Sequence, residues 1–64
     1  MLTIEEVKEH LPRVELRYFD RIYSAVIRGR QDKFATVFWN DRSWQFSWET
    51  ITRAINADRP LVVI

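Results

Sequence analysis

The chain of 64 residues has no cysteine, one glycine, one histidine and two prolines. Without cysteine it forms no disulfide, and one histidine supplies too few ligands for a zinc site. A single glycine also excludes the glycine-rich loops that bind phosphate. His10 stands before Leu11 and Pro12 at the end of an expected helix, with no serine or cysteine nucleophile in its context. We therefore expect no metal, no cofactor and no enzymatic activity.

The sequence also lacks a strong charge and any long apolar run. Ten basic and nine acidic residues leave a net charge of +1, which argues against a strongly basic nucleic-acid-binding protein. Residues 1–6 have neither the basic nor the apolar region of a signal peptide. The longest apolar run, residues 61–64, is far shorter than the roughly 18 residues of a membrane span. These absences predict a soluble, cytoplasmic protein that does not contact a membrane.

What the chain does contain is apolar and aromatic side chains. The hydrophobic share of 47% and the aromatic share of 14% are too high for a disordered chain. At this length we expect a single small domain over residues 1–64. A domain of this size buries only about 60% of its unfolded surface, so its stability should be marginal.

A short helix is predicted at the N-terminus, over residues 4–11. Thr3 is its expected N-cap, and Glu6 stands three residues further on, as in a capping box. Pro12 ends the helix, because the residue before a proline is pushed out of the helical region.

Residues 13–28 fit two interpretations. Their polar residues gather on one side of a helical wheel, as in an amphipathic helix. Their apolar residues, however, are mostly β-branched or aromatic, which favours strands, and Val14, Leu16 and Tyr18 alternate with charged residues. Residues 28–33 are polar and include the only glycine, so a hairpin can turn there. We favour strands and keep a helix over 13–28, in an ααββα order, as the alternative.

The second half of the chain predicts a hairpin, a helix and a final strand. Residues 34–39 read as a strand, 40–42 as a turn, and 43–48 as an alternating strand with Trp44, Phe46 and Trp48 on one face. Ser47 is the expected N-cap of a helix that ends near Ala57. The last four residues form a short strand that pairs into the sheet or with a second molecule: Leu61, Val62, Val63 and Ile64.

The predicted fold is α+β, with a short N-terminal helix, an antiparallel β-meander, a C-terminal helix and a short final strand. This order is similar to a small SH3-like barrel. Residues 14–55, about two-thirds of the chain, resemble chromo- and Tudor-type domains. Residues 34–40 (FATVFWN) resemble a chromodomain strand that ends in an aromatic near a turn, and residues 47–51 (SWETI) resemble its tryptophan–glutamate step into the C-terminal helix.

This resemblance is partial. Thr50 stands where the family usually has proline, and no residues match the partners of a methyl-lysine cage by position. For the ligand, the resemblance implies only that Trp39 is one aromatic residue of such a cage.

Trp39 is also a candidate binding residue on other grounds. It follows Phe38, so in a strand the two side chains point to opposite faces and we expect one of them to be exposed. An exposed tryptophan beside a turn is a candidate anchor for a partner. Four basic residues flank the hairpin turns and, if clustered at one end, could contact phosphates or an acidic partner: Arg28, Arg30, Lys33 and Arg42.

These features predict a small protein-interaction module, or a regulator or inhibitor, that acts by binding a protein partner. A nucleic-acid-binding module is the first alternative, with Trp39 stacking on bases and the basic residues on phosphates. A small structural subunit of a larger complex is the second, since marginal size and an apolar terminus suit a chain that is stable only when bound. The segment 61–64 is the expected contact of a homo-oligomer.

Overall fold

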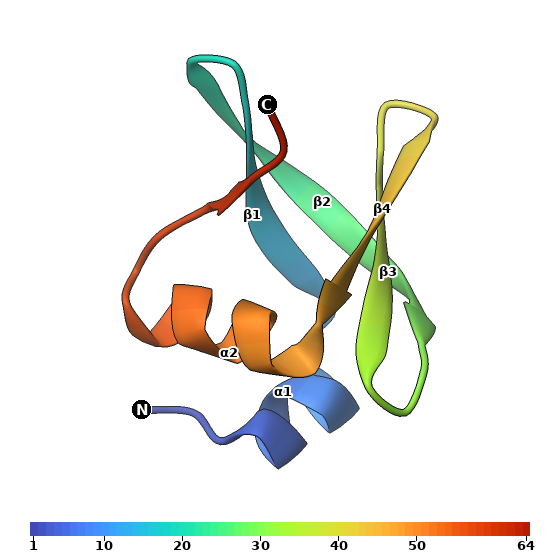
Figure 1. Ribbon diagram of the computed structural model, residues 1–64, viewed down its shortest axis with the longest axis vertical. Coiled ribbons are helices and arrows are strands. Elements are labelled where there is room, and N and C mark those ends of the chain that lie inside the picture. Colours follow the sequence, from blue (N-terminus) through green and yellow to red (C-terminus); the bar gives the residue numbers. More distant parts are fainter.

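An N-terminal helix, a four-stranded meander, a second helix and a short final strand follow one another along the chain (Figure 1). The computed structural model describes residues 1–64. The elements are α1 (Ile4–His10), β1 (Arg13–Tyr18), β2 (Arg21–Arg30), β3 (Phe34–Trp39), β4 (Arg42–Ser47), α2 (Trp48–Asn56) and β5 (Leu61–Val62). This order confirms the predicted α+β class and the antiparallel meander.

The strands form one five-stranded sheet in the order β4-β3-β2-β1-β5. Strands β1 to β4 pair antiparallel in sequence, whereas β5 runs parallel to β1, with Leu61 opposite Leu16 and Val62 opposite Arg17. The sheet curls into a half-barrel. Both helices lie at one end of it, and the tips of the β1–β2 and β3–β4 hairpins lie at the other (Figure 1). We call these the closed end and the open end.

Residues 13–28 are strands, so the helical alternative is wrong. The register places Leu16 opposite Tyr23, so that apolar side chains of neighbouring strands share the concave face of the sheet. The alternation changes phase after β1 because residues 19–20 form a tight turn that reverses the chain. A β-bulge near the end of β2 shifts the register once more.

The apolar core lies between the concave face of the sheet and the two helices. The largest fully buried side chains are Leu16 and Val37 from the sheet and Val7 and Ile51 from the helices. Burying one such side chain contributes about 1.5–3 kcal/mol to stability. The complete core consists of Val7, Val14, Leu16, Ala25, Ile27, Ala35, Val37, Trp48, Ile51 and Leu61.

Both helices have the predicted caps. The Thr3 hydroxyl accepts from the N–H of Glu6, and the Glu6 carboxylate accepts from the N–H of Thr3, which completes the capping box. Ser47 caps α2 by accepting from the N–H of Thr50, and α2 ends at Asn56, next to the predicted end. Neither helix has the length and apolar character needed to cross a membrane.

Trp48 begins α2 instead of ending the alternating strand. The residue is 2% exposed, and its indole Nε1 donates to the carbonyl oxygen of Gln31 at 2.7 Å. Its backbone N–H donates to the carbonyl oxygen of Lys33. These bonds tie the start of α2 to the β2–β3 turn, so the aromatic residues that β4 presents on the concave face are Trp44 and Phe46 alone.

We expect Thr3→Ala to lower the free energy of unfolding by about 1 kcal/mol, because α1 loses its N-cap acceptor. Thr3→Ser keeps the hydroxyl and should lose little. Urea unfolding near neutral pH measures both variants. A loss as large in Thr3→Ser as in Thr3→Ala would contradict the capping role of the hydroxyl.

The same cap predicts a pH dependence. The pKa of the Glu6 carboxyl lies below its ordinary value of 4.5, because the backbone N–H and then the hydroxyl of Thr3 donate to it. A carboxyl pKa that is lowered on folding stabilises the fold above 4.5, and this contribution is lost as the pH falls through the lowered value. Glu6→Gln has no carboxyl at this position. It should therefore lose less stability than the wild type as the pH falls from 4.5 through the lowered pKa of Glu6. Parallel acid-induced losses in urea unfolding would contradict this.

Candidate binding site

The open end of the half-barrel holds four half-buried aromatic side chains, one from each strand of the meander. We call them the aromatic cluster: Tyr18, Tyr23, Trp39 and Trp44. Trp39 lies at its centre, with its ring centroid 4.3 Å from that of Tyr23, 5.3 Å from that of Tyr18 and 6.4 Å from that of Trp44. One ring therefore brings the two hairpins together.

The strand register puts the aromatic cluster on the concave face. Tyr23 lies opposite Leu16 and Trp44 lies opposite Val37, and both aliphatic side chains are fully buried. Directly opposed residues of neighbouring strands share a face. The helices cover this face at the closed end, whereas at the open end the rings cover one another and remain half exposed.

Phe19 extends the aromatic cluster to the tip of the β1–β2 hairpin. Its ring meets that of Tyr18 edge to face, with the centroids 4.6 Å apart. The residue is 58% exposed and its φ is 58°, in the left-handed region that bulky residues rarely adopt. This conformation costs about 1–2 kcal/mol, which a glycine would avoid. The hairpin thus presents an apolar ring to solvent at a cost in backbone energy.

Phe19 was not among the predicted site residues. Nothing in the sequence marks a phenylalanine as the first residue of a tight turn, since glycine or asparagine is usual there. The sequence does indicate a turn or bend at residues 19–20, because the alternation of apolar and polar residues changes phase there.

Arg42 connects the two hairpin tips across the open end. Its Nη1 donates to the Tyr18 hydroxyl at 3.0 Å, and its guanidinium carbon lies 5.3 Å from the centroid of the Tyr18 ring. Arg21 is the cross-strand neighbour of Tyr18 and therefore belongs to the same face. Neither arginine forms a salt bridge within the chain. Two guanidinium groups without a carboxylate partner thus border the aromatic cluster.

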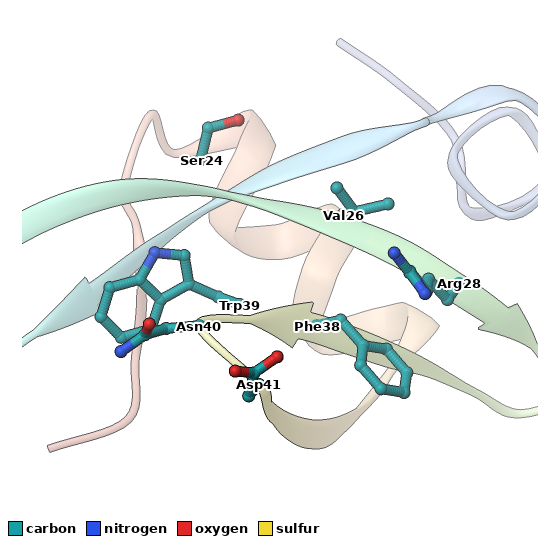
Figure 2. Close-up of a pocket in the computed structure, with 7 residues that line it drawn as sticks. All are labelled: Ser24, Val26, Arg28, Phe38, Trp39, Asn40 and Asp41. Carbon is teal, nitrogen blue, oxygen red and sulfur yellow. The ribbon is translucent and has the colours of Figure 1, made fainter.

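Phe38, and not Trp39, is the exposed member of the pair at the end of β3 (Figure 2). Phe38 is 37% exposed on the outer face of the sheet, and the Arg28 guanidinium carbon lies 5.4 Å from its ring centroid. The two side chains do point to opposite faces, but Trp39 is half-buried because its face is the concave one. A shallow groove of about 580 Å³ beside them is lined by Ser24, Val26, Arg28, Phe38, Trp39, Asn40 and Asp41.

The four predicted basic residues do not form one patch. Successive turns of an antiparallel meander lie at opposite ends of the sheet, so Lys33 in the β2–β3 turn is separated from Arg42 by the length of β3. Arg28 lies on the outer face and Arg30 on the side of α1. The condition for a shared contact with phosphates or an acidic partner, a cluster of all four at one end, is therefore not met.

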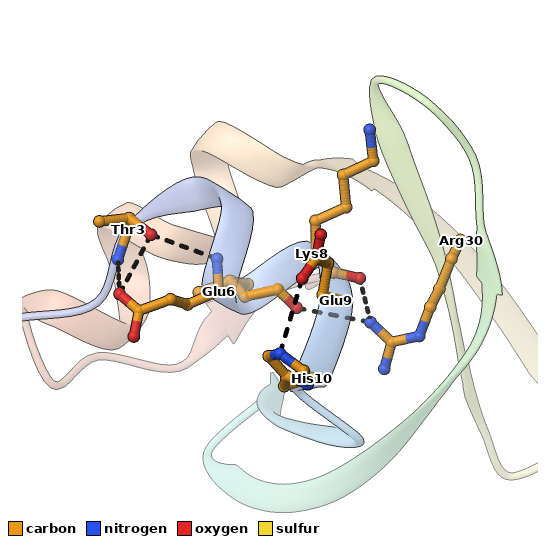
Figure 3. A network of polar contacts seen from close by, with 7 residues as sticks. Thr3, Glu6, Lys8, Glu9, His10 and Arg30 are labelled. Carbon is orange, nitrogen blue, oxygen red and sulfur yellow. Dashed lines mark hydrogen bonds and ion pairs between the residues drawn. The ribbon is translucent and has the colours of Figure 1, made fainter.

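Arg30 has a structural role (Figure 3). Its guanidinium donates to the carbonyl oxygen of Lys8 at 2.6 Å and to those of Val7 and Leu11. The carbonyls at the end of a helix have no partner within the helix, so these bonds complete α1. The guanidinium carbon also lies 5.7 Å from the centroid of the Trp48 ring. Arg30 thus holds α1 against β2 and the start of α2.

The chemistry that the open end offers is that of a binding surface. Its apolar rings can pack against an apolar side chain, and its guanidinium groups can donate to carboxylates or backbone carbonyls.

Elsewhere, His10 is exposed with its Nε2 3.6 Å from the Glu9 carboxylate, and no three His, Cys, Asp or Glu side chains lie together as a metal site would need.

We expect Arg30→Ala to lower the free energy of unfolding by about 1–3 kcal/mol, because the end of α1 loses a charged donor. Arg28→Ala removes an arginine of the same strand from the outer face and should change that free energy by less than about 0.5 kcal/mol. Urea unfolding followed by circular dichroism compares the two. Equal losses would contradict the structural role of Arg30.

No known protein family matches this chain, and neither does any curated protein or solved structure. The similarity to SH3-like barrels therefore stays at the level of a small, curled, five-stranded half-barrel. Such a fold alone does not specify a ligand, because one architecture carries many unrelated sites.

Proposed function

We propose that this protein is a non-enzymatic interaction module, or a regulator or inhibitor, that binds a partner protein through the aromatic cluster and Phe19. One observation carries the proposal: five aromatic rings from both hairpins gather at the end of the concave face that the helices leave uncovered. Tyrosine, tryptophan and arginine dominate the residues on which protein–protein affinity depends, and this end combines all three.

The surface also suits binding because it is rigid. Its four central rings stand on strands and are half-buried, so a partner that packs against them has little side-chain motion to restrict. Phe19 adds an exposed apolar ring. The energetic cost of its strained backbone must be offset by a stabilising interaction elsewhere, and burial of the ring against a partner would supply one. Arg21 and Arg42 give the partner's carboxylates or carbonyls two donors at the border.

The resemblance to chromo- and Tudor-type domains is part of this proposal, with one reservation from the geometry. An aromatic cage for a methylated lysine needs open ring faces for the cation. In this chain the Arg42 guanidinium already lies over the Tyr18 ring and bonds its hydroxyl. The arrangement therefore favours an apolar or acidic partner surface over a cationic ligand.

Nucleic-acid binding is the second candidate, and one observation favours it. Arg28 lies over the exposed ring of Phe38 on the outer face, a pairing that could stack a base and contact a phosphate. The separation of Lys33 from Arg42 argues against a continuous path for a phosphate backbone. We therefore place it below the protein-binding proposal.

The test is recovery of a partner from the native host with the tagged full chain, followed by titration of the purified partner. We expect Arg42→Ala to weaken its binding about tenfold and Trp39→Ala more strongly, because both lie in the proposed contact. Phe38→Ala is the control, since it removes an exposed ring from the opposite face.

Arg42→Ala is decisive if Trp39→Ala fails to fold, because the Arg42 side chain lies outside the core. Unchanged affinity in a folded Arg42→Ala protein, together with loss of binding in Phe38→Ala, would move the site to the outer face. Recovery of nucleic acid that is released by higher salt would favour the second candidate.

A further inference from the structure

Strand β4 is an edge strand, with no strand of the chain paired to its outer side. In the sheet order it pairs with β3 only, through a register that runs without a shift from Phe34 opposite Ser47 to Trp39 opposite Arg42. Alternate residues of an antiparallel edge strand direct their backbone N–H and C=O groups away from the neighbouring strand. Trp39 and Arg42 flank the two-residue turn between β3 and β4 and form the hydrogen-bonded pair that such a turn requires. By the alternation, the backbone N–H and C=O groups of Ser43 and Gln45 point to the free side of β4.

This edge also lacks the features that usually prevent strand addition. Natural edges are blunted by proline, lysine, bulges or short length. Strand β4 has six residues, no proline, no bulge and one charged residue, Arg42, at its start. The other edge of the sheet, β5, has only two residues and follows Pro60. The contrast makes β4 the edge that is suited to pairing.

We propose that β4 pairs antiparallel with β4 of a second copy of this chain, about a two-fold axis through Gln45. Directly opposed residues must lie on the same face of a joined sheet, which allows only registers centred on a residue. In the register centred on Gln45, Trp44 of each copy lies opposite Phe46 of the other, and Ser43 lies opposite Ser47. The two five-stranded sheets then become one continuous sheet of two copies.

The strand is complementary to itself, which is why the occupant is a second copy. Residues 43–47 carry no charge, so self-pairing opposes no like charges within the contact. Trp44 and Phe46 are half-buried on the concave face, and each pair across the axis would cover ring surface that is now exposed. The same register brings Arg42 to the start of α2 of the second copy, next to Glu49, whose carboxylate also pairs with Arg53 of its own chain.

The dimer would also enlarge the proposed binding surface without depending on it. Trp44 belongs both to the aromatic cluster and to the predicted contact, so the two clusters would meet across the axis. Partner binding and self-association are measured separately, however. A monomer that binds a partner through Arg42 would overturn the dimer alone, and a dimer that binds no protein would overturn the proposed function alone.

Sedimentation velocity of the full chain at increasing concentration tests the dimer. We expect twice the monomer mass for the wild type and for Gln45→Thr, which keeps the backbone N–H in a good strand former. Gln45→Pro removes that N–H from the free edge, where proline is tolerated within a sheet, and should give a folded monomer. A wild-type monomer throughout, or a Gln45→Pro dimer with an unchanged circular dichroism spectrum, would overturn the proposal.

A single introduced cysteine tests the register, since the chain has none of its own. Opposed residues in a bonded antiparallel pair lie about 5.5 Å apart at Cα, within the reach of a disulfide. Gln45→Cys should therefore form a covalent dimer on mild oxidation. Ser43→Cys is the control, because the two copies of residue 43 would lie four residues apart, about 13 Å. Equal cross-linking of the two variants would overturn the proposed register, including in a case where Gln45→Pro fails to fold.

Discussion

The concave face of the sheet extends beyond the end that its two helices cover. The helices, of seven and nine residues, lie across one end of the half-barrel (Figure 1), so they cover only the nearby parts of the strands. They bury the closed end, where Leu16, Val37 and Ile51 are fully enclosed. At the open end the same face must be filled by the side chains of the strands themselves, and large aromatic rings do this. The need to fill the open end therefore accounts both for the high aromatic content and for the half-burial of these rings.

Two arginines hold the ends of the half-barrel together, and each does so by contacts with backbone carbonyls or an aromatic ring. Arg30 completes the last turn of α1 and lies over Trp48, so it fixes the helices to the sheet. Arg42 bonds the Tyr18 hydroxyl and lies over its ring, so it links the two hairpin tips. An arginine-rich chain with a net charge of only +1 thus uses some of its arginines as internal connectors. Two of the four basic residues considered for phosphate binding, Arg30 and Arg42, thus have contacts within the chain at opposite ends of the half-barrel.

Local signals in the sequence were enough for the elements, but not for the surface. Thr3 and Ser47 marked the helix starts because capping depends on residues three positions apart. Residues 13–28 remained ambiguous, since only pairing with neighbouring strands decides between helix and strand. The exposure of Trp39 and the partners of Arg30 depend on which face the helices cover, which is a tertiary property. Phe19 could not be predicted, because its strained turn is fixed by the strands on either side of it.

The aromatic rings at the two ends of the half-barrel differ in environment: they are dry at the closed end and accessible to solvent at the open end. The indole N–H groups of the three tryptophans report this directly by solvent exchange in nuclear magnetic resonance. The N–H of Trp48 is hydrogen-bonded to Gln31 in the core, whereas those of Trp39 and Trp44 have no partner in the chain and are not among its buried polar atoms. We expect slow exchange for Trp48 and fast exchange for Trp39, which lies outside the proposed β4 contact. Equal protection of these two N–H groups would contradict the difference between the ends, because the aromatic cluster would then be part of a closed core.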